Sequence, residues 1–414
     1  MTKLELLAPA GDFSKLKTAF YYGADAVYVG GKSMSLRALA GNFSDAELAE
    51  AVEYTHSIGK KIYVTVNIFA RNGDLDFATN YLKYLESLNI DGAIISDPGL
   101  IYLAKTVAPT LKINVSTQAN VLNKMTVKFW RDTGVERVIL ARELSFDEIK
   151  EIHEFCPDVE IETFIHGAMC ISYSGRCLLS NYLTGRESNR GACVQACRWE
   201  YEIREKSKGG EFLTIEEDDR GTYILNSKDL NLMDYICELA DSGVISFKIE
   251  GRMKSEYYLA TVINAYRRAI DGYYKFGKDY KNNPLYQEEL KKTAHREFTT
   301  AYFLGNNDHT VNYDDSQSKG SRKFIASVLN YNDEKGALIE MRNRFKVGDV
   351  LEVLSPSENF NKKITVTYME NEKGESVDDA KLVQQKLWLK TDVKLSAGDI
   401  LRMETEDVMI KKTK

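Results

Sequence analysis

The sequence has no long apolar run, and we expect no secretory leader. None of its 414 residues belongs to a stretch of about 18 consecutive apolar residues, which is the length that a membrane-spanning helix needs. The first residues, MTKLELLAPAGD, enter a strand pattern directly, without the apolar core of a signal peptide. We therefore expect a cytoplasmic protein that does not associate with a membrane.

An excess of positive charge is also lacking. The net charge is −6 at pH 7, in a chain with 43% hydrophobic and 28% charged residues, as in an ordinary globular protein. This balance argues against indiscriminate nucleic-acid binding and leaves a local basic patch open.

Several catalytic motifs are absent. His153 and Glu154 begin an HExxH string, but Pro157 stands where the second histidine should be. There is no GxSxG, and no GxGxxG follows the first strand pattern, while GGKS at 30–33 is too short for a phosphate loop. These absences disfavour a zinc protease, a serine hydrolase and a dinucleotide-binding domain.

Residues 4–275 alternate between short β-branched runs and helical patterns, which is typical of a parallel sheet with crossover helices. Eight strand candidates predict an α/β protein with a TIM-type (β/α)8 barrel, and an open doubly wound sheet is the alternative. The candidates are LELLAP at 4, AVYVG at 26, KIYVTVN at 61, GAIIS at 92, KINVSTQ at 112, RVILARE at 137, VEIETFIHG at 159 and SFKIEGR at 246.

Helix starts are marked by hydroxyl side chains. Ser44 with Glu47 and Ser145 with Glu148 fit the capping box, and Ser255 could cap a helix with one apolar stripe.

The domain prediction divides the chain into three parts. Residues 1–275 form the catalytic barrel, with a cysteine-rich insertion at 167–245 that follows the seventh strand, where a barrel carries its active face. Residues 276–320 form a linker with one short helix. From 321 to 414 the period becomes two, which indicates a small antiparallel β-barrel, and VGDVLEV at 347 and AGDILRM at 397 use one turn-strand unit twice.

Strand alternation places polar side chains inside the predicted barrel. The apolar faces must pack on the helices, so the opposite faces point inward, although a barrel interior is normally filled by Val, Ile and Leu. One interpretation is a self-satisfied ion network and the other is a polar ligand pocket at the C-terminal ends of the strands. The charged members are Glu162, Lys248, Glu250 and Arg252, joined by Asn67, Gln118, His166 and, less clearly because the sixth strand is apolar on both faces, Arg142.

Four of the six cysteines lie close together, at Cys170, Cys177, Cys193 and Cys197. Clustered thiols in a chain without a secretory signal indicate metal ligands or redox thiols. The spacing does not match the paired CxxC of a zinc ribbon, so we favour an iron–sulfur cluster over zinc, and reduced structural thiols remain an alternative. Cys237 lies on an apolar helical stripe and fits the core better than a ligand position.

The stretch from Glu162 to Ser180 matches ExFxxGAMCxxxxGxCxLS, which resembles the signature of the collagenase-like peptidases of unassigned catalytic type, the U32 peptidases. APAGD, NRGACVQACRW, NSKDL and FKIEGRMKS also resemble that family, and the C-terminal part is similar to a translation-factor barrel. Within the family, the chain looks most like the prephenate-dependent tRNA hydroxylation proteins, which form 5-hydroxyuridine at the wobble position. Related branches hydroxylate ubiquinone and ribosomal RNA.

The resemblance implies a [4Fe–4S] cluster with ligands at Cys170, Cys177 and Cys193. Many relatives place the fourth ligand directly after KDL, where this chain has Asn231, which leaves Cys197 as first choice and Cys237 as second.

The resemblance also implies roles for the polar residues. Arg252 and Lys248 would hold prephenate, Glu162 or Glu250 would move protons, and Asn67, Gln118, Arg142 and His166 would contact substrate. Transfer RNA would be the partner, with a paralogous partner subunit open. The alternative functions are a metal- or thiol-dependent peptidase and a non-catalytic RNA-binding factor.

Overall fold

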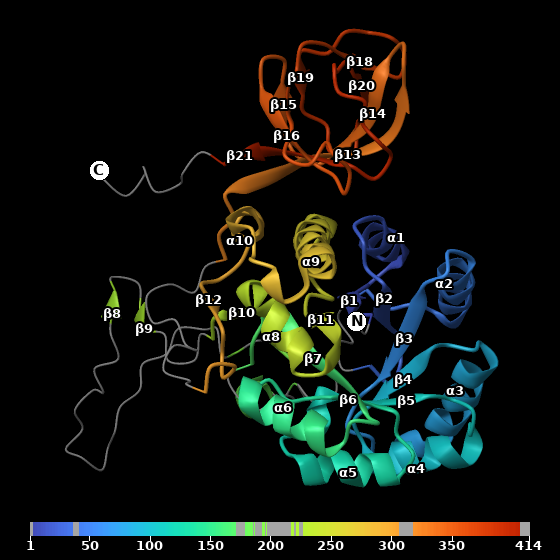
Figure 1. Cartoon of the computed structure of the whole chain (residues 1–414). Coiled ribbons are helices and arrows are strands. Elements are labelled where there is room, and N and C mark those ends of the chain that lie inside the picture. The colour runs from blue at the N-terminus through green and yellow to red at the C-terminus, as the bar shows by residue number, and fades with distance from the viewer. Residues whose placement is uncertain are drawn as a thin grey trace.

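The computed structural model describes residues 3–35, 41–170, 179–184, 186, 193–194, 196, 217–218, 221–222, 227–305 and 318–405. A parallel barrel ringed by helices and a smaller curled antiparallel sheet make up the molecule (Figure 1). In the described residues no helix is long and apolar enough to cross a membrane.

The predicted eight-stranded parallel barrel is confirmed. Strand β11 pairs in parallel with both β1 and β7, so the sheet closes on itself, and the open doubly wound alternative is wrong. The strands are β1 (Glu5–Pro9), β2 (Ala26–Gly30), β3 (Lys61–Val66), β4 (Gly92–Ile95), β5 (Ile113–Val115), β6 (Arg137–Ile139), β7 (Glu160–Ala168) and β11 (Val244–Ile249).

Helices cover the outside of this barrel (Figure 1). They are α1 (Phe13–Tyr21), α2 (Asp45–Ser57), α3 (Leu75–Ser87), α4 (Pro98–Val107), α5 (Lys124–Asp132), α6 (Phe146–Phe155), α8 (Ile236–Asp241) and α9 (Glu256–Phe276). The other described α-helices are α7 (Leu179–Thr184) and α10 (Pro284–Leu290). Both predicted capping boxes are formed, at the starts of α2 and α6, and the Ser255 side chain caps α9. A cap of this kind contributes about 1 kcal/mol.

The chain that follows α9 folds back on the barrel. Within the predicted linker, α10 packs against α9, and strand β12 (Phe298–Thr299) pairs with β10 (Asp229–Asn231). Strand β10 runs antiparallel to the end of β7, so the barrel sheet gains two short strands on that side. A separate hairpin joins β8 (Glu217–Asp218) to β9 (Gly221–Thr222). The domain boundaries themselves stay a prediction.

The C-terminal domain, residues 321–405, is the predicted antiparallel unit and has its own apolar core. Its main sheet has the order β17–β16–β21–β13–β14–β20–β18. Gly348 and Gly398 precede the neighbouring strands β16 and β21 with φ of +94° and +98°, so the repeated turn-strand unit uses the same left-handed glycine twice. The strands are β13 (Arg322–Asn332), β14 (Gly336–Met341), β16 (Val350–Leu354), β17 (Lys363–Thr365), β18 (Met369–Asn371), β20 (Lys386–Leu389) and β21 (Ile400–Glu404), besides the pair β15 (Phe345–Lys346) and β19 (Asp379–Ala380).

A buried ion cluster joins the predicted linker to the C-terminal domain. The Arg402 guanidinium lies 2.5 Å from Glu289 and 2.7 Å from Glu352, and the Lys292 ammonium lies 2.9 Å and 2.8 Å from the same two carboxylates. The Tyr22 hydroxyl also donates to the carbonyl of Leu354 at 2.9 Å. Breaking a buried pair leaves an uncompensated charge, so this contact resists separation of the domains.

Candidate active site

The barrel interior holds a connected set of buried charges near the N-terminal ends of the strands. Glu162 is 0% exposed, and its carboxylate lies 2.7 Å from the Lys248 ammonium and 3.2 Å from the Arg137 guanidinium. Arg137 also lies 2.6 Å from Glu5, whose carboxylate accepts a hydrogen bond from Ser246 at 2.9 Å. The strand register explains the cluster, because Ser246 of β11 lies opposite Glu5 of β1 and Glu162 of β7.

The charges of this interior cluster compensate one another. Burial raises the pKa of Glu5, but the Arg137 guanidinium, together with Lys61 and Ser246, lowers it by more and holds the pKa below its usual value. Burial also acts to lower the pKa of Arg137, and the carboxylates of Glu5 and Glu162 reverse that effect. Glu162 and Lys248 therefore belong to a self-satisfied ion network, which was one of the two interpretations of the inward polar residues. A catalytic role for them stays a prediction.

Sequence reasoning missed Glu5 and Arg137. Each is the first residue of its strand, where it stands beside an apolar run. Their inward direction could have been found only by aligning all eight strands around a barrel.

At the other end of the barrel, Arg252 extends across the C-terminal ends of the strands. Its Nη1 donates to Thr65 Oγ1 at 3.1 Å, and Thr65 Oγ1 lies 3.0 Å from Ser35 Oγ. The neighbouring Glu250 carboxylate accepts a hydrogen bond from the Tyr28 hydroxyl at 3.3 Å. The structure thus brings Arg252 and Glu250 to the ends of β2, β3 and β11, which is the active face of a barrel of this kind.

Gly30 allows the Arg252 guanidinium to lie at the end of β2. A Cβ at this glycine would clash with Arg252 Nη1 and would stand 2.7 Å from Ser35 Oγ. We expect Gly30→Ala to lose about 1–3 kcal/mol of stability, the usual cost of overpacking, and to displace Arg252. Urea unfolding measures the loss.

Gly73→Ala is the matched control, because a Cβ there meets nothing within 4 Å. Equal stability of the two alanine variants would contradict the close approach of Arg252 to Gly30.

Three more predicted residues lie around the strand ends. Arg142 follows β6 and donates from Nη1 to the carbonyl of Ala168 at 2.8 Å, two residues before Cys170. Gln118 is buried in a 3-10 turn at 117–119, and within the described residues its Oε1 has no hydrogen-bond partner. Asn67 is half-buried after β3. The sequence left the direction of Arg142 open, because its strand is apolar on both faces. The structure directs Arg142 to the chain just before Cys170.

His166 takes a different place. It is 1% exposed, and its ring packs against Tyr258 and Tyr266 of α9 and Phe298 of β12. Burial lowers the pKa of His166 to about 3, so the ring is neutral. Because its ring contacts come from outer elements, the structure does not group His166 with Arg252, and substrate contact by His166 stays a prediction.

The cysteine segment begins where β7 ends. Cys170 directly follows Met169, whose carbonyl accepts a hydrogen bond from Ser227 at 2.9 Å. Beside Cys193, the backbone N–H of Val194 donates to Ser180 Oγ at 3.2 Å. Cys170 and Cys193 are both partly exposed, whereas Cys177 and Cys197 lie outside the described residues.

The second choice for a fourth ligand, Cys237, and Asn231, which stands where many relatives have a ligand, both have other contacts. Cys237 Sγ lies 3.7 Å from the carbonyl of Tyr280, and burial raises its pKa, which favours the neutral thiol. The Asn231 side chain accepts from the N–H of Met233 at 3.0 Å and donates to Gln287 at 2.8 Å. Both side chains thus contribute to packing on the outer side of the barrel.

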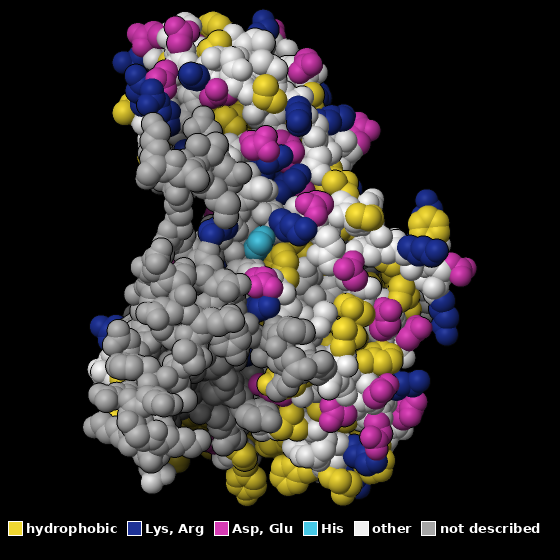
Figure 2. All heavy atoms as spheres, turned by 90° about the vertical axis from the view of Figure 1, so that its left-hand side faces the viewer, with side chains coloured by type: hydrophobic (Ala, Val, Ile, Leu, Met, Phe, Trp, Pro, Cys, Tyr) yellow, Lys and Arg dark blue, Asp and Glu magenta, His cyan; other side chains and the backbone are white. Residues whose placement is uncertain are grey.

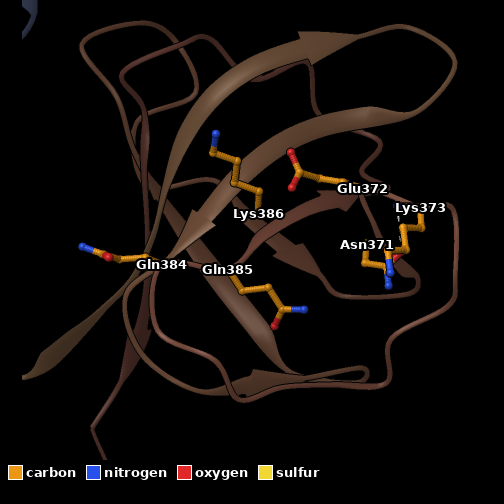
Figure 3. A pocket seen from close by; sticks show the side chains of 6 residues that line it. All are labelled: Asn371, Glu372, Lys373, Gln384, Gln385 and Lys386. Atoms are coloured by element: carbon orange, nitrogen blue, oxygen red, sulfur yellow. Dashed lines mark hydrogen bonds between the residues drawn. The ribbon is translucent and has the colours of Figure 1, made fainter.

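The C-terminal domain has a shallow hollow of its own. Asn371, Glu372, Lys373, Gln384, Gln385 and Lys386 line it (Figure 3). None of the predicted site residues lies there. On the face drawn in Figure 2, Lys and Arg side chains are mixed with Asp and Glu over both domains, which agrees with the slightly negative net charge.

The fold and the site define a (β/α)8-barrel protein with a cysteine segment after its seventh strand and an antiparallel C-terminal domain. The chain belongs to peptidase family U32, whose model matches residues 11–313, and the model of the family's C-terminal domain matches residues 321–402. The family resemblance inferred from the sequence is therefore confirmed.

Three relatives describe the chain's place in the family. It is 42% identical to tRNA hydroxylation protein P1 of Bacillus subtilis, over 97% of this chain and 94% of that protein. It is 39% identical to tRNA hydroxylation protein P of Escherichia coli, over 97% of each chain. It is 36% identical to the 23S rRNA 5-hydroxycytidine C2501 synthase of Escherichia coli, over 73% of this chain and 45% of that protein.

Proposed function

We propose that this protein is a tRNA-hydroxylating enzyme that converts wobble uridine to 5-hydroxyuridine. The observation that carries the proposal is the identity of 42% to a tRNA hydroxylation protein over nearly the full length of both chains. A relative named for rRNA hydroxylation supports the same reaction class. Peptide hydrolysis is the alternative, supported by the family name and by relatives named as a protease in Methanocaldococcus jannaschii, 38% identical, and as a collagenase in Porphyromonas gingivalis, 33% identical. The sequence contains neither HExxH nor GxSxG, which disfavours this alternative.

We further propose that Cys170, Cys177, Cys193 and Cys197 hold a [4Fe–4S] cluster. The two described members fit such a group, because both are partly exposed and Cys170 stands at the end of a barrel strand. Thiolates bind both iron–sulfur clusters and zinc, so zinc is the alternative. When bound, the cluster would supply one-electron redox chemistry.

Prephenate is the proposed co-substrate, and the arginines at the strand ends are its proposed binding groups. Arg252 and Arg142 offer planar donor pairs that suit carboxylates. Lys248 lies deeper and pairs with Glu162, so it would act through the charge balance of the barrel interior. Glu250, which accepts a hydrogen bond from the Tyr28 hydroxyl, is the proposed proton carrier at the strand ends.

Anaerobic purification followed by iron, sulfide and zinc assays tests the cofactor. We expect about four irons and four sulfides per chain. One zinc without sulfide would overturn the cluster.

In parallel, the gene is expressed in a bacterial strain that lacks its own tRNA hydroxylation genes, and tRNA nucleosides are measured by mass spectrometry. Return of 5-hydroxyuridine is expected, dependent on prephenate synthesis; its absence would overturn the proposed reaction.

A further inference from the structure

A buried ion pair that no role yet covers lies beside the cysteine segment. Arg296 donates from Nε and Nη2 to Asp229 Oδ1 at 3.1 Å and 2.8 Å, and its backbone N–H donates to Oδ2 at 3.1 Å. Both residues are 3% exposed. Burial raises the pKa of Asp229, but Arg296, with smaller effects of Lys254 and His166, holds it below the usual value, so this carboxylate is ionised at neutral pH.

This pair is attached to the strand end that carries Cys170. Asp229 of β10 lies opposite Ala168 of β7, two residues before Cys170. Ser227 donates to the carbonyl of Met169, the residue between them. On its other side, Asp229 lies opposite Phe298 of β12, so Arg296 and Asp229 connect β12, β10 and β7.

Backbone pairing alone is a weak anchor here. Strand β10 has three residues and β12 has two, and together they form the outer end of the barrel sheet. Strands this short contribute few ladder hydrogen bonds. A buried, multiply hydrogen-bonded arginine–carboxylate pair adds charge-assisted bonds with a fixed direction, and either partner left alone would be a buried, uncompensated charge.

We propose that Asp229 and Arg296 are positioning residues that fix Cys170 at the end of β7 and thereby hold the first thiolate of the metal site. This inference rests on the proposed function for the identity of the bound group, and on the structure alone for the anchoring of the strand.

The test compares Asp229→Asn, Arg296→Lys and, as the matched control, Glu297→Gln. Glu297 neighbours Arg296, but its side chain is 52% exposed, and among the described residues its ion-pair partner is Lys228, at 2.7 Å. Hydrogen exchange of peptides covering residues 162–170 is measured on each full-length protein. We expect Asp229→Asn to exchange about tenfold faster there, Arg296→Lys to lie between it and the wild type, and Glu297→Gln to match the wild type.

Anaerobically purified samples provide the second readout. In the presence of a chelator, the visible cluster absorbance of Asp229→Asn is expected to decay about tenfold faster than that of the wild type. The decay in Arg296→Lys should lie between the two. Wild-type exchange at 162–170 in a folded Asp229→Asn protein would overturn the inference. If Asp229→Asn does not fold, the exchange of Arg296→Lys decides in the same way. If the wild type holds no cluster, the proposed cofactor fails, while hydrogen exchange still decides the anchoring.

Discussion

Cys170→Ala is expected to reduce 5-hydroxyuridine in tRNA to the level of a strain that lacks the enzyme. Changes to residues that merely support a metal ligand typically cost about 10- to 100-fold in affinity or activity, so removing a ligand is expected to cost at least about 100-fold. Bound iron and sulfide should fall together with the modification. Nucleoside mass spectrometry and metal assays of the same cultures measure both quantities.

Cys237→Ala and Cys197→Ala accompany this variant and separate the two choices for the fourth ligand. The Cys237 thiol is directed to the carbonyl of Tyr280, so its loss should leave iron content and hydroxylation close to wild type. Cys197→Ala should behave like Cys170→Ala. Full iron content and hydroxylation in Cys170→Ala would contradict the cluster. A loss in Cys170→Ala and Cys237→Ala, with Cys197→Ala close to wild type, would reassign the fourth ligand to Cys237.

The sequence predicted the barrel well because each strand carries a local signal. A short buried run followed by a capped helix is visible within about 20 residues, and right-handed βα repetition then leaves few topologies. The closure of the sheet between β1 and β11 depends on residues some 240 positions apart in the chain, as in the pairing of Glu5 with Ser246, and only the eightfold count indicated it.

The inward and outward directions of the polar side chains were predicted correctly for some residues and wrongly for others. Alternation correctly grouped Glu162 with Lys248, because their strands pair regularly there. It also grouped His166 with them, but the register shifts: Phe164 lies opposite Lys248 and His166 lies opposite Ile249, so Ile165 is an extra residue on β7. A bulge changes which face the following residues use, and nothing in the local sequence marks it.

The anchoring pair could not be predicted for a different reason. Asp229 stands in the NSKDL motif, but its partner Arg296 lies in the polar stretch predicted to be a linker. The two meet because the chain returns from α10 to the edge of the barrel sheet, and no periodic pattern specifies such a return.

Glu162→Gln is expected to lower the free energy of unfolding of the barrel by about 3–5 kcal/mol, the usual cost of removing one partner from a buried ion pair. Arg137 keeps the carboxylates of Glu5 and Glu160, at 2.6 Å and 2.7 Å, but Lys248 loses the carboxylate at 2.7 Å that compensates its buried charge. Urea unfolding followed by circular dichroism measures the change.

Two further variants show whether the loss comes from the uncompensated ammonium. Glu288→Gln removes a carboxylate from a surface pair with Lys291 at 2.7 Å and should cost no more than about 1 kcal/mol. Glu162→Gln combined with Lys248→Met removes both charges at similar volume, and it should recover at least about half of the loss, because a buried pair can often be replaced by apolar groups without penalty. If the double variant is as unstable as Glu162→Gln, the loss arises instead from Arg137 or from packing. If Glu162→Gln itself costs less than about 1 kcal/mol, the interior network does not stabilise the barrel.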